Sequence, residues 1–491
     1  MLKDIAALGR ESVIYGFSTV LARLLNFLLV PFYTYFLAPA DYGVAASVFA
    51  YIAFLNIIYQ YGMDQAYMRF TAGRNPDDPV VFSTPLLAVT ASSAVLSAGL
   101  ILFSGPLAEL CGIGRGFAPL VVYSALVLAL DAVCIVPFAR LRMKHRAWKF
   151  VGVRTLSIAV NVGMNIVMLA VLRRGPEGIF IAALAASGVS LLLLLPDMLR
   201  IARPRFDRAL FSDMAAFAWP FVPSGLASMI VQVVDRPIVM FLAGATAVGV
   251  YQAGYKMGIF MMLIVVMFDQ AWRPFFLERA RQPGAERMFA RVFTLFSFAG
   301  VWVTLAIALF IGDLLRFPVH GVYLLHPDYR GGIAVVPLVL VAYLFYGFYI
   351  NFMVAPVLSK KTGMLVWVTL AGGLSNIAGN FLLVPHFSII GAGWATLVSY
   401  LIMAVCLYFA GRRVYPVPYE WSRVLKVFAC AGLLLGCAWA AVRCGAPVRA
   451  AKLSVLLFYP VILGLAGFYR TAEIEELKKI FVRLGERYGK A

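Results

Sequence analysis

The chain has 491 residues, of which 63% are hydrophobic and 13% are charged, and its formal net charge is +19. A soluble domain is about half apolar and a quarter charged, so this composition predicts a protein that is solvated by lipid. The positive charge does not indicate nucleic-acid binding, because Lys and Arg occupy short loops between apolar segments, where they set topology and contact anionic lipid head groups.

The predicted elements are helices that cross the membrane, each about 20 mostly apolar residues long. We expect spans near residues 12–37, 43–71, 81–104, 117–140, 149–172, 178–200, 213–243, 247–275, 288–312, 330–358, 362–384, 389–411, 422–443 and 451–470. The N-terminal residues enter the first span without a small-residue cleavage site, so we expect the first helix to be retained. The sequence therefore predicts an all-α polytopic membrane protein with about fourteen transmembrane helices.

The loop charges predict how these helices are oriented. With the N-terminus in the cytoplasm, the inside segments carry 30 Lys and Arg and the outside loops carry 8. An excess of this kind marks cytoplasmic loops, and the clearest inside loop is the basic run 140–146. We therefore expect a multi-pass protein of the bacterial inner membrane with both termini in the cytoplasm.

Short internal echoes predict two related lobes. Two echoes share an offset of 205 residues and a third joins two asparagine pairs: Phe36-Leu37-Ala38 with Phe241-Leu242-Ala243, Asp64-Gln65-Ala66 with Asp269-Gln270-Ala271, and Asn161/Asn165 with Asn376/Asn380. Each lobe would hold six helices, and because six is even the repeat is parallel, with its axis along the membrane normal. We expect an N-lobe at 1–205, a C-lobe at 206–412 around a central cavity, and two extra helices at 413–470.

The last segment, 471–491, is a polar tail with a helical apolar stripe. Its apolar residues fall on one face, and its basic residues lie largely elsewhere: Ile474, Leu477, Ile480, Phe481, Leu484 and Tyr488, against Lys478, Lys479, Arg483 and Arg487. This pattern is typical of an interfacial amphipathic helix. We interpret it as an anchor on the cytoplasmic leaflet, with a docking site for a partner as the alternative.

Ionisable side chains inside spans are the candidate functional residues, because each costs about 2.5–3.5 kcal/mol on insertion even by the mildest scale. The first helix carries Tyr15, Thr19, Arg23 and Asn26 on one face. The seventh helix carries a similar stripe of Ser224, Ser228, Gln232 and Asp235. Two facing stripes would line a cavity between the lobes, although Ser and Thr also serve polar helix packing. Arg23 favours the cavity, since a guanidinium at mid-membrane needs water or an anion.

Further cations lie deeper in the chain. Asp235-Arg236-Pro237 interrupts the seventh helix, and Lys256 lies at a comparable depth on the eighth. These residues form either an ion-pair network centred on Asp235 or a cationic patch that an acidic residue tunes or gates. Arg154 lies near the inside end of the fifth helix, where it either extends towards the interface or contacts a phosphate at the cytoplasmic mouth.

Three acidic residues complete the candidate set. Asp131 lies within the fourth helix, and it keeps a cation-binding or ion-coupling role open. Asp64 and Asp269 lie near inner helix ends, where they are expected to pair with loop arginines such as Arg69 and Arg273 rather than to carry protons.

The cysteines and motifs argue against a metal, a cofactor or catalysis. The six cysteines lie in or beside apolar segments without a CxxC pair or a histidine cluster, so they are interpreted as buried thiols. The chain has no Walker sequence for ATP, so energy would come from gradients or mass action. Asp77-Asp78 stands alone in a short loop and is interpreted as a solvated turn rather than as part of an enzyme site.

Two runs of residues resemble a known family. They are Pro223-Ser-Gly with Val234-Asp-Arg-Pro and Val248-Gly-Val-Tyr-Gln-Ala-Gly-Tyr-Lys256, and the opening Tyr15-Gly with Arg23, Pro31 and Phe-Leu-Ala-Pro-Ala-Asp-Tyr-Gly43. They resemble the bacterial polysaccharide flippases for O-antigen or exopolysaccharide, within the multidrug/oligosaccharidyl-lipid/polysaccharide exporter (MOP) superfamily. The resemblance spans nearly the whole chain, including its six-plus-six-plus-two helices.

The resemblance implies a flippase that moves an undecaprenyl-diphosphate-linked oligosaccharide to the outer leaflet by alternating access, driven by an H+ or Na+ gradient. Its expected partners are this substrate, membrane lipids, the coupling cation and a polysaccharide polymerase. The substrate residues would be Arg23, Asn26, Arg154, Gln232, Arg236 and Lys256, and the coupling or gating residues Asp64, Asp131, Asp235 and Asp269. A drug or cation antiporter of the same superfamily is the alternative, followed by a lipid II flippase or a membrane glycan enzyme.

Overall fold

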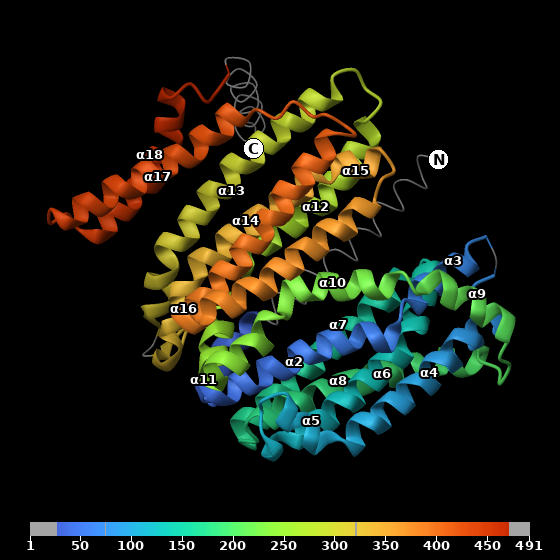
Figure 1. Cartoon of the computed structure of the whole chain (residues 1–491). Coiled ribbons are helices and arrows are strands. Elements are labelled where there is room, and N and C mark those ends of the chain that lie inside the picture. The colour runs from blue at the N-terminus through green and yellow to red at the C-terminus, as the bar shows by residue number, and fades with distance from the viewer. Residues whose placement is uncertain (1–26, 74, 320–321, 471–491) are drawn as a thin grey trace, which may run out of the picture. The chain divides into compact units, whose positions relative to one another are not determined.

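The computed structural model describes residues 27–73, 75–319 and 322–470, and within these ranges the chain is helical apart from one two-residue pair of strands (Figure 1). The helices are α2 (Pro39–Gln60), α3 (Met63–Thr71), α4 (Pro79–Leu102), α5 (Ser104–Leu110), η1 (Arg115–Phe117), α6 (Ala118–Met143), α7 (Ala147–Ile166), η2 (Val167–Val171), α8 (Pro176–Ile201), α9 (Arg208–Ala218), α10 (Phe221–Val233), α11 (Asp235–Met257), α12 (Ile259–Arg279), α13 (Ala285–Arg316), η3 (Pro327–Val335), α14 (Val336–Phe352), α15 (Val354–Leu358), α16 (Gly363–Arg412), α17 (Trp421–Arg443) and α18 (Val448–Leu465). The strands β1 (Pro318–Val319) and β2 (Val322–Tyr323) pair antiparallel.

The described residues contain 12 helices that are long and apolar enough to cross a membrane. One of them, α16, is 50 residues long and reverses at Ser388 (φ 48°, ψ −130°), so it comprises two of the predicted spans. Gly244 (φ 81°, ψ 174°) divides α11 in the same way, where the predicted seventh span gives way to the eighth. The apolar helix Phe27–Phe36 lies within the predicted first span. The predicted fold class, an all-helical polytopic membrane protein, is confirmed.

The predicted second span is two helices rather than one. α2 ends at Gln60, and α3 begins at Met63 after Tyr61 and Gly62 adopt positive φ angles of 29° and 73°. A side chain at Gly62 would be strained by this backbone conformation, and its Cβ would lie 3.0 Å from the carbonyl oxygen of Ala218. Glycine here lets the inner end of the span bend and pack closely on α9.

The N-terminal helices surround one apolar core. Tyr59, Met63 and Tyr67 from α2 and α3 pack with Phe82 of α4 and Val136 of α6, and all are fully buried. Figure 1 shows α2, α4, α6, α7 and α8 as neighbouring helices in the blue to green part of the chain. This bundle holds in place the polar residues described below.

The helices that begin at Pro39 and just after Gly244 cross at backbone distance. A Cβ on Gly43 would lie 1.8 Å from the carbonyl oxygen of Ala245, and a Cβ on Gly249 would lie 1.9 Å from that of Pro39. When 205 is added to the numbers of the first segment, Gly43 falls next to Gly249 and Pro39 falls next to Ala245. Each segment therefore contacts its counterpart through nearly equivalent residues, as expected where equivalent segments meet at a pseudo-two-fold axis. Only residues without a side chain allow this approach.

The third internal echo also has a matching structure. The Asn165 side-chain amide donates to the Asn161 carbonyl at 2.8 Å, and the Asn380 amide donates to the Asn376 carbonyl at 2.9 Å. After each pair the chain turns at a residue with positive φ, 49° at Arg173 and 48° at Ser388. Arg173 and Ser388 are separated by the same 215 residues as the asparagine pairs.

Contacts within the chain divide it into two compact units, whose boundaries differ from those of the predicted lobes. One unit comprises the described residues up to Gly258 with Phe317–Val339 and Val366–Met403, and the other comprises Ile259–Arg316, Leu340–Leu365 and the described residues from Ala404 onward. The lobes at 1–205 and 206–412 and the extra pair at 413–470 were inferred from sequence repeats and stay a prediction. The predicted amphipathic tail, 471–491, lies outside the described residues.

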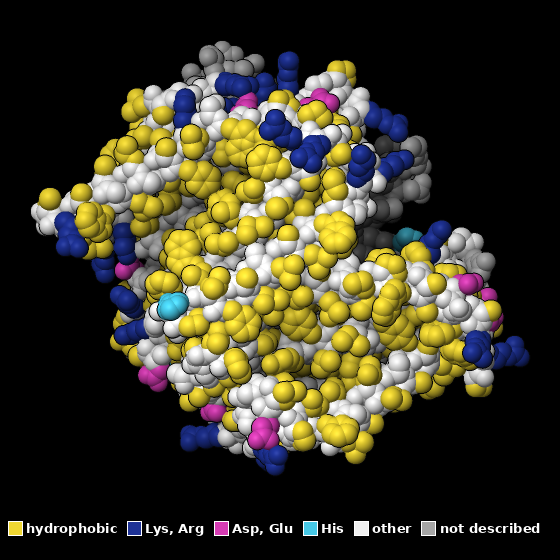
Figure 2. Space-filling model, viewed as in Figure 1, with side chains coloured by type: hydrophobic (Ala, Val, Ile, Leu, Met, Phe, Trp, Pro, Cys, Tyr) yellow, Lys and Arg dark blue, Asp and Glu magenta, His cyan; other side chains and the backbone are white. Residues whose placement is uncertain are grey.

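The surface agrees with a membrane environment. Large apolar side chains such as Leu192, Trp367, Leu382 and Leu457 are each at least 66% exposed. Figure 2 shows hydrophobic side chains over most of the visible face. Such broad apolar exposure is unfavourable in water and favourable against lipid.

Candidate functional site

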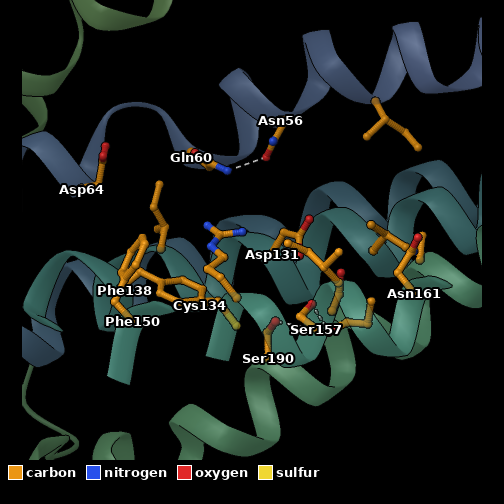
Figure 3. A pocket seen from close by; sticks show the side chains of 18 of the residues that line it. Asn56, Gln60, Asp64, Asp131, Cys134, Phe138, Phe150, Ser157, Asn161 and Ser190 are labelled. Atoms are coloured by element: carbon orange, nitrogen blue, oxygen red, sulfur yellow. Dashed lines mark hydrogen bonds between the residues drawn. The ribbon is translucent and has the colours of Figure 1, made fainter. Parts of the chain in front are cut away.

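The site with the clearest structure is a cavity of about 600 Å³ among the N-terminal helices. It lies between α2, α6, α7 and α8 and is lined by both polar and apolar side chains (Figure 3). The polar and charged lining residues are Asn56, Gln60, Asp64, Asp131, Arg142, Arg154, Ser157, Asn161, Ser187 and Ser190. Such a concentration of polar groups within helices that otherwise face lipid indicates a water-filled or ligand-binding space.

Helical spacing explains why these side chains converge. Asn56, Gln60 and Asp64 recur every four residues along α2 and α3, and the Gln60 amide donates to the Asn56 side-chain oxygen at 2.5 Å. Arg154 and Asn161 lie seven residues apart on α7 and therefore share a face. Figure 3 shows the α2 stripe facing Asp131 across the cavity.

Arg154 is held by aromatic rings. Its guanidinium carbon lies 4.3 Å from the centre of the Phe138 ring and 5.9 Å from that of Phe150. A guanidinium over an aromatic face is stabilised by the ring quadrupole, while its N–H donors stay available to an anion. Arg154 is exposed and lines the cavity, a position that fits the predicted contact with a phosphate, and extension towards the interface stays the alternative.

Asp131 lies opposite Arg154 without an ion pair. The carboxyl group interacts with the Ser187 hydroxyl and, through space, with the Arg154 guanidinium. Among the described residues, however, no carboxylate oxygen lies within 4.0 Å of a nitrogen of Arg154. The cavity thus holds a cation and an anion that interact electrostatically but leave room for a third group.

Asp64 pairs with an arginine of the basic run 140–146, so the expected pairing with a loop arginine is met by Arg142 rather than by Arg69. The Asp64 carboxylate lies 3.4 Å from a terminal nitrogen of Arg142. The neighbouring Gln65 amide also donates to Asp64 at 2.8 Å. The reason is tertiary, because the break at Tyr61 and Gly62 turns α3 so that Asp64 faces the end of α6. The corresponding prediction for Asp269 is correct, with Arg273 donating to it at 2.7 Å.

Asp235 and Arg236, which interrupt the predicted seventh helix, form a buried ion-pair network. Arg236 lies 2.6 Å from the Asp235 carboxylate and donates to the carbonyl of Gln232 at 2.5 Å. The Tyr251 hydroxyl donates to the other oxygen of Asp235. Asp235 and Arg236 are 2% and 6% exposed, so the charge of Arg236 is already neutralised. Of the two sequence interpretations, the geometry favours the network.

The other predicted substrate residues are placed as follows. The Gln232 amide donates to the Ser228 hydroxyl at 3.1 Å, so part of the predicted stripe bonds within its own helix. Lys256 lies half-buried in the last turn of α11, where it interacts with other groups. Arg23, Asn26 and the rest of the first-helix stripe lie outside the described residues.

Two sets of cavity residues are not predicted as a site by the sequence. Arg142 was noted only as part of the basic loop, because it lies at the inner end of α6. Asn56 and Gln60, which form a stripe with Asp64, are not among the predicted site residues, although the four-residue spacing of the stripe places these polar side chains on one helical face. Asp77 lies in a turn, as expected, but its side chain is only partly solvated, because it accepts hydrogen bonds from Arg140 at 2.8 Å and from Lys144.

Solved structures with a similar fold are membrane transporters. The lipid II flippase MurJ in an inward closed conformation matches with a TM-score of 0.72 at 15% identity, over 93% of this chain and 100% of that chain. An inward-facing MATE family multidrug resistance transporter of the MOP superfamily matches with a TM-score of 0.60 at 15% identity, over 80% and 94%. The Vibrio cholerae MATE transporter VcmN in its bent form matches with a TM-score of 0.56 at 13% identity, over 83% and 96%. The chain therefore has the transporter fold of the MOP superfamily.

The sequence itself identifies the family. The family model described as "Polysaccharide biosynthesis protein" matches residues 34–315, which is more than half of the chain. The chain belongs to this family of polysaccharide biosynthesis proteins, as the resemblance in the sequence indicated. A comparison with curated proteins found no match.

Proposed function

We propose that the protein is a flippase that moves an undecaprenyl-diphosphate-linked oligosaccharide from the cytoplasmic to the periplasmic leaflet of the bacterial inner membrane. The observation that carries the proposal is the cavity of about 600 Å³ lined by Arg142 and Arg154, in a chain of a polysaccharide biosynthesis family with a MOP transporter fold.

The chemistry of the cargo fits such a cavity. A diphosphate carries about two negative charges, and guanidinium groups bind phosphate oxygens through paired hydrogen bonds. Sugars need a wet space lined with hydrogen-bonding groups, which Asn56, Gln60 and Asn161 supply. The prenyl chain can stay in the lipid throughout, so only the polar head group needs a path through the protein.

Coupling to an H+ or Na+ gradient during alternating access is part of the proposal. Asp131 is the best-supported candidate for this role, because it lines the cavity and forms no ion pair with Arg154. Asp235 and Asp269 already pair with Arg236 and Arg273, and Asp64 pairs with Arg142 at longer distance. Both termini would lie in the cytoplasm, where a polysaccharide polymerase would be a further partner.

The cations within spans predict a cationic path for the diphosphate, formed by Arg23, Arg236 and Lys256 with Arg154, and substitutions along it test the proposal in cells. Arg23→Ala should abolish glycan export while the protein is still inserted at normal levels, and Arg23→Lys should restore export only in part, because an ammonium lacks the guanidinium fork. Lys256→Ala should weaken export. Normal glycan export by both alanine variants, at normal protein levels, would rule out the cationic path.

A drug or cation antiporter of the same superfamily is the second candidate. The observation in its favour is Asp131, a carboxylate in a cavity that an organic cation could enter. Binding assays on purified protein separate the two candidates: the flippase should bind a prenyl diphosphate and ignore an organic cation, and the antiporter should do the reverse.

A further inference from the structure

The cavity contains two arginines and two carboxylates, whose arrangement suggests how it would bind an anion. This inference rests on the proposed flippase function. The charged lining residues among those described are Asp64 on α3, Asp131 and Arg142 on α6, and Arg154 on α7. α8 contributes hydroxyl groups at Ser187 and Ser190 but no titratable lining residue, and Cys134 of α6 is the remaining titratable group of the described lining. The cavity is therefore close to neutral when it is empty.

The two arginines are poorly satisfied by their carboxylates. Arg142 reaches Asp64 only at 3.4 Å, and its Nε is buried without a hydrogen-bond partner. Arg154 rests on Phe138 rather than on a carboxylate. The two guanidinium groups also repel each other through space. Two like charges at one cavity, both with free donor capacity, are stabilised by an anion that both can contact.

We propose that Arg142 and Arg154 form one anion site for a diphosphate group, and that Asp64 and Asp131 are internal placeholders for its charge. The diphosphate displaces Asp64 from Arg142, and it binds Arg154 in front of Asp131, which neutralises that arginine only through space. In the empty protein, each carboxylate partly neutralises the neighbouring arginine. A diphosphate offers more oxygens and about twice the charge of a carboxylate, so it takes over the arginine donors. Both carboxylates then face added negative charge.

This arrangement links anion binding to protons. A diphosphate in the cavity brings about two negative charges next to Asp131, which favours protonation of this carboxylate. By reciprocity, protonation of that carboxylate strengthens anion binding by the same factor. The protein should therefore take up protons when it binds the diphosphate, and it should bind the diphosphate more tightly at lower pH.

Binding to the purified full-length protein in detergent tests the site. The probes are inorganic pyrophosphate and geranyl diphosphate, which distinguish a free from a lipid-linked diphosphate. Arg142→Ala and Arg154→Ala should each weaken binding about tenfold or more, as expected for loss of a charge-assisted contact. Arg200→Ala removes an exposed arginine of α8 that does not line the cavity and should change affinity less than about twofold. Equal affinity in wild type, Arg142→Ala and Arg154→Ala would overturn the site.

A gain of binding guards against variants that fail to fold. Asp131→Asn removes a placeholder charge, so it should tighten binding at about pH 8 and reduce the pH dependence between about pH 8 and 6. The ionisation of the probe is the same for both proteins, so the difference between them isolates the contribution of Asp131. Asp64→Asn should likewise tighten binding by freeing Arg142. If neither substitution changes the affinity or the proton uptake, the placeholder role is wrong.

The outcome is separable from the proposed function. Loss of diphosphate binding in the arginine variants with intact glycan export would leave the site standing and contradict the flippase assignment. Normal diphosphate binding by the arginine variants, together with loss of glycan export in Arg23→Ala, would contradict the anion site and leave the flippase assignment standing. Tight binding of geranyl diphosphate with weak binding of pyrophosphate would assign the site to a lipid-linked ligand, and equal binding would assign it to the diphosphate alone.

Discussion

Two arginines within membrane spans show how differently the same side chain is accommodated. A guanidinium in a span needs a partner that offsets the loss of water. Arg236 obtains it from the adjacent Asp235 and from the Gln232 carbonyl, which leaves no net charge. Arg154 obtains it from the Phe138 ring and from the cavity. The first arrangement stabilises the helix, and the second leaves a charge available for binding.

The Asp235–Arg236 pair should therefore behave as a structural unit. Arg236→Ala leaves a buried carboxylate without its partner and should destabilise the protein by about 3 kcal/mol. The double variant Asp235→Asn with Arg236→Gln should recover much of that loss, because no buried charge remains. Thermal unfolding of the purified variants measures this. Equal stability of Arg236→Ala and wild type would show that Arg236 is not needed to neutralise Asp235.

The environment of Asp77, which lies in the loop before α4, should make the stability of the protein depend on pH. Burial alone would raise the pKa of this carboxyl group, but hydrogen bonds from Lys144 and Arg140 outweigh burial and hold the pKa below its ordinary value. A lowered folded-state pKa gives stability that is present above the unfolded-state pKa, about 3.9. That stability is lost as the pH falls through the lower pKa of the folded protein.

The comparison of Asp77→Asn with wild type measures this effect. At neutral pH the variant should melt lower, because Asp77 loses the negative charge that neutralises the buried Arg140 and the partly exposed Lys144. The difference should shrink as the pH falls below about 4, where the wild-type carboxylate is also neutralised. A difference that is constant or grows in acid would contradict this assignment.

At the scale of elements, close helix packing depends on glycine at one crossing. Gly43 and Gly249 let the helices after Pro39 and Gly244 meet at backbone distance, where any Cβ would overlap a carbonyl oxygen. Helix contacts of this kind in membranes gain stability from van der Waals packing rather than from hydrophobic burial.

Gly43→Val should force this crossing apart. Overpacking at a close contact typically costs about 1–3 kcal/mol, so the variant should melt lower or adopt a different conformation. Gly188→Ala is the matched control, because Gly188 lies within α8 and nothing lies within 4 Å of its Cβ position. That substitution should be neutral or slightly stabilising. Equal stability of Gly43→Val and Gly188→Ala would show that the crossing is looser than the backbone distances indicate.

At the scale of the whole molecule, the charge pattern predicts topology. The 30 Lys and Arg on the expected inside and the 8 on the expected outside predict that both termini lie in the cytoplasm. A reporter that is active only in the periplasm, fused after Ala491, should be silent, and the same reporter in an outside loop should be active. Strong activity after Ala491 would mean that the predicted number of spans is wrong by one.

The sequence by itself determined the fold class and the family. Long apolar segments have no alternative to helices in a bilayer, because each backbone group must be bonded within its own segment. The resemblance around Val234-Asp-Arg-Pro237 identified the family that the family model matches. The sequence also pointed to Arg154 and Asp131 as ionisable residues inside spans.

Tertiary structure alone decided which of these groups meet. Whether Arg236 serves a ligand or a carboxylate depends on rotamers, and the pairing of Asp64 with Arg142 depends on the break at Tyr61 and Gly62. Composition and periodicity record burial and the face of a helix, but contacts between side chains 78 residues apart are set by how helices pack. For that reason the cavity, with Arg142 and Arg154 at its wall, became visible only when α2, α6, α7 and α8 were brought together.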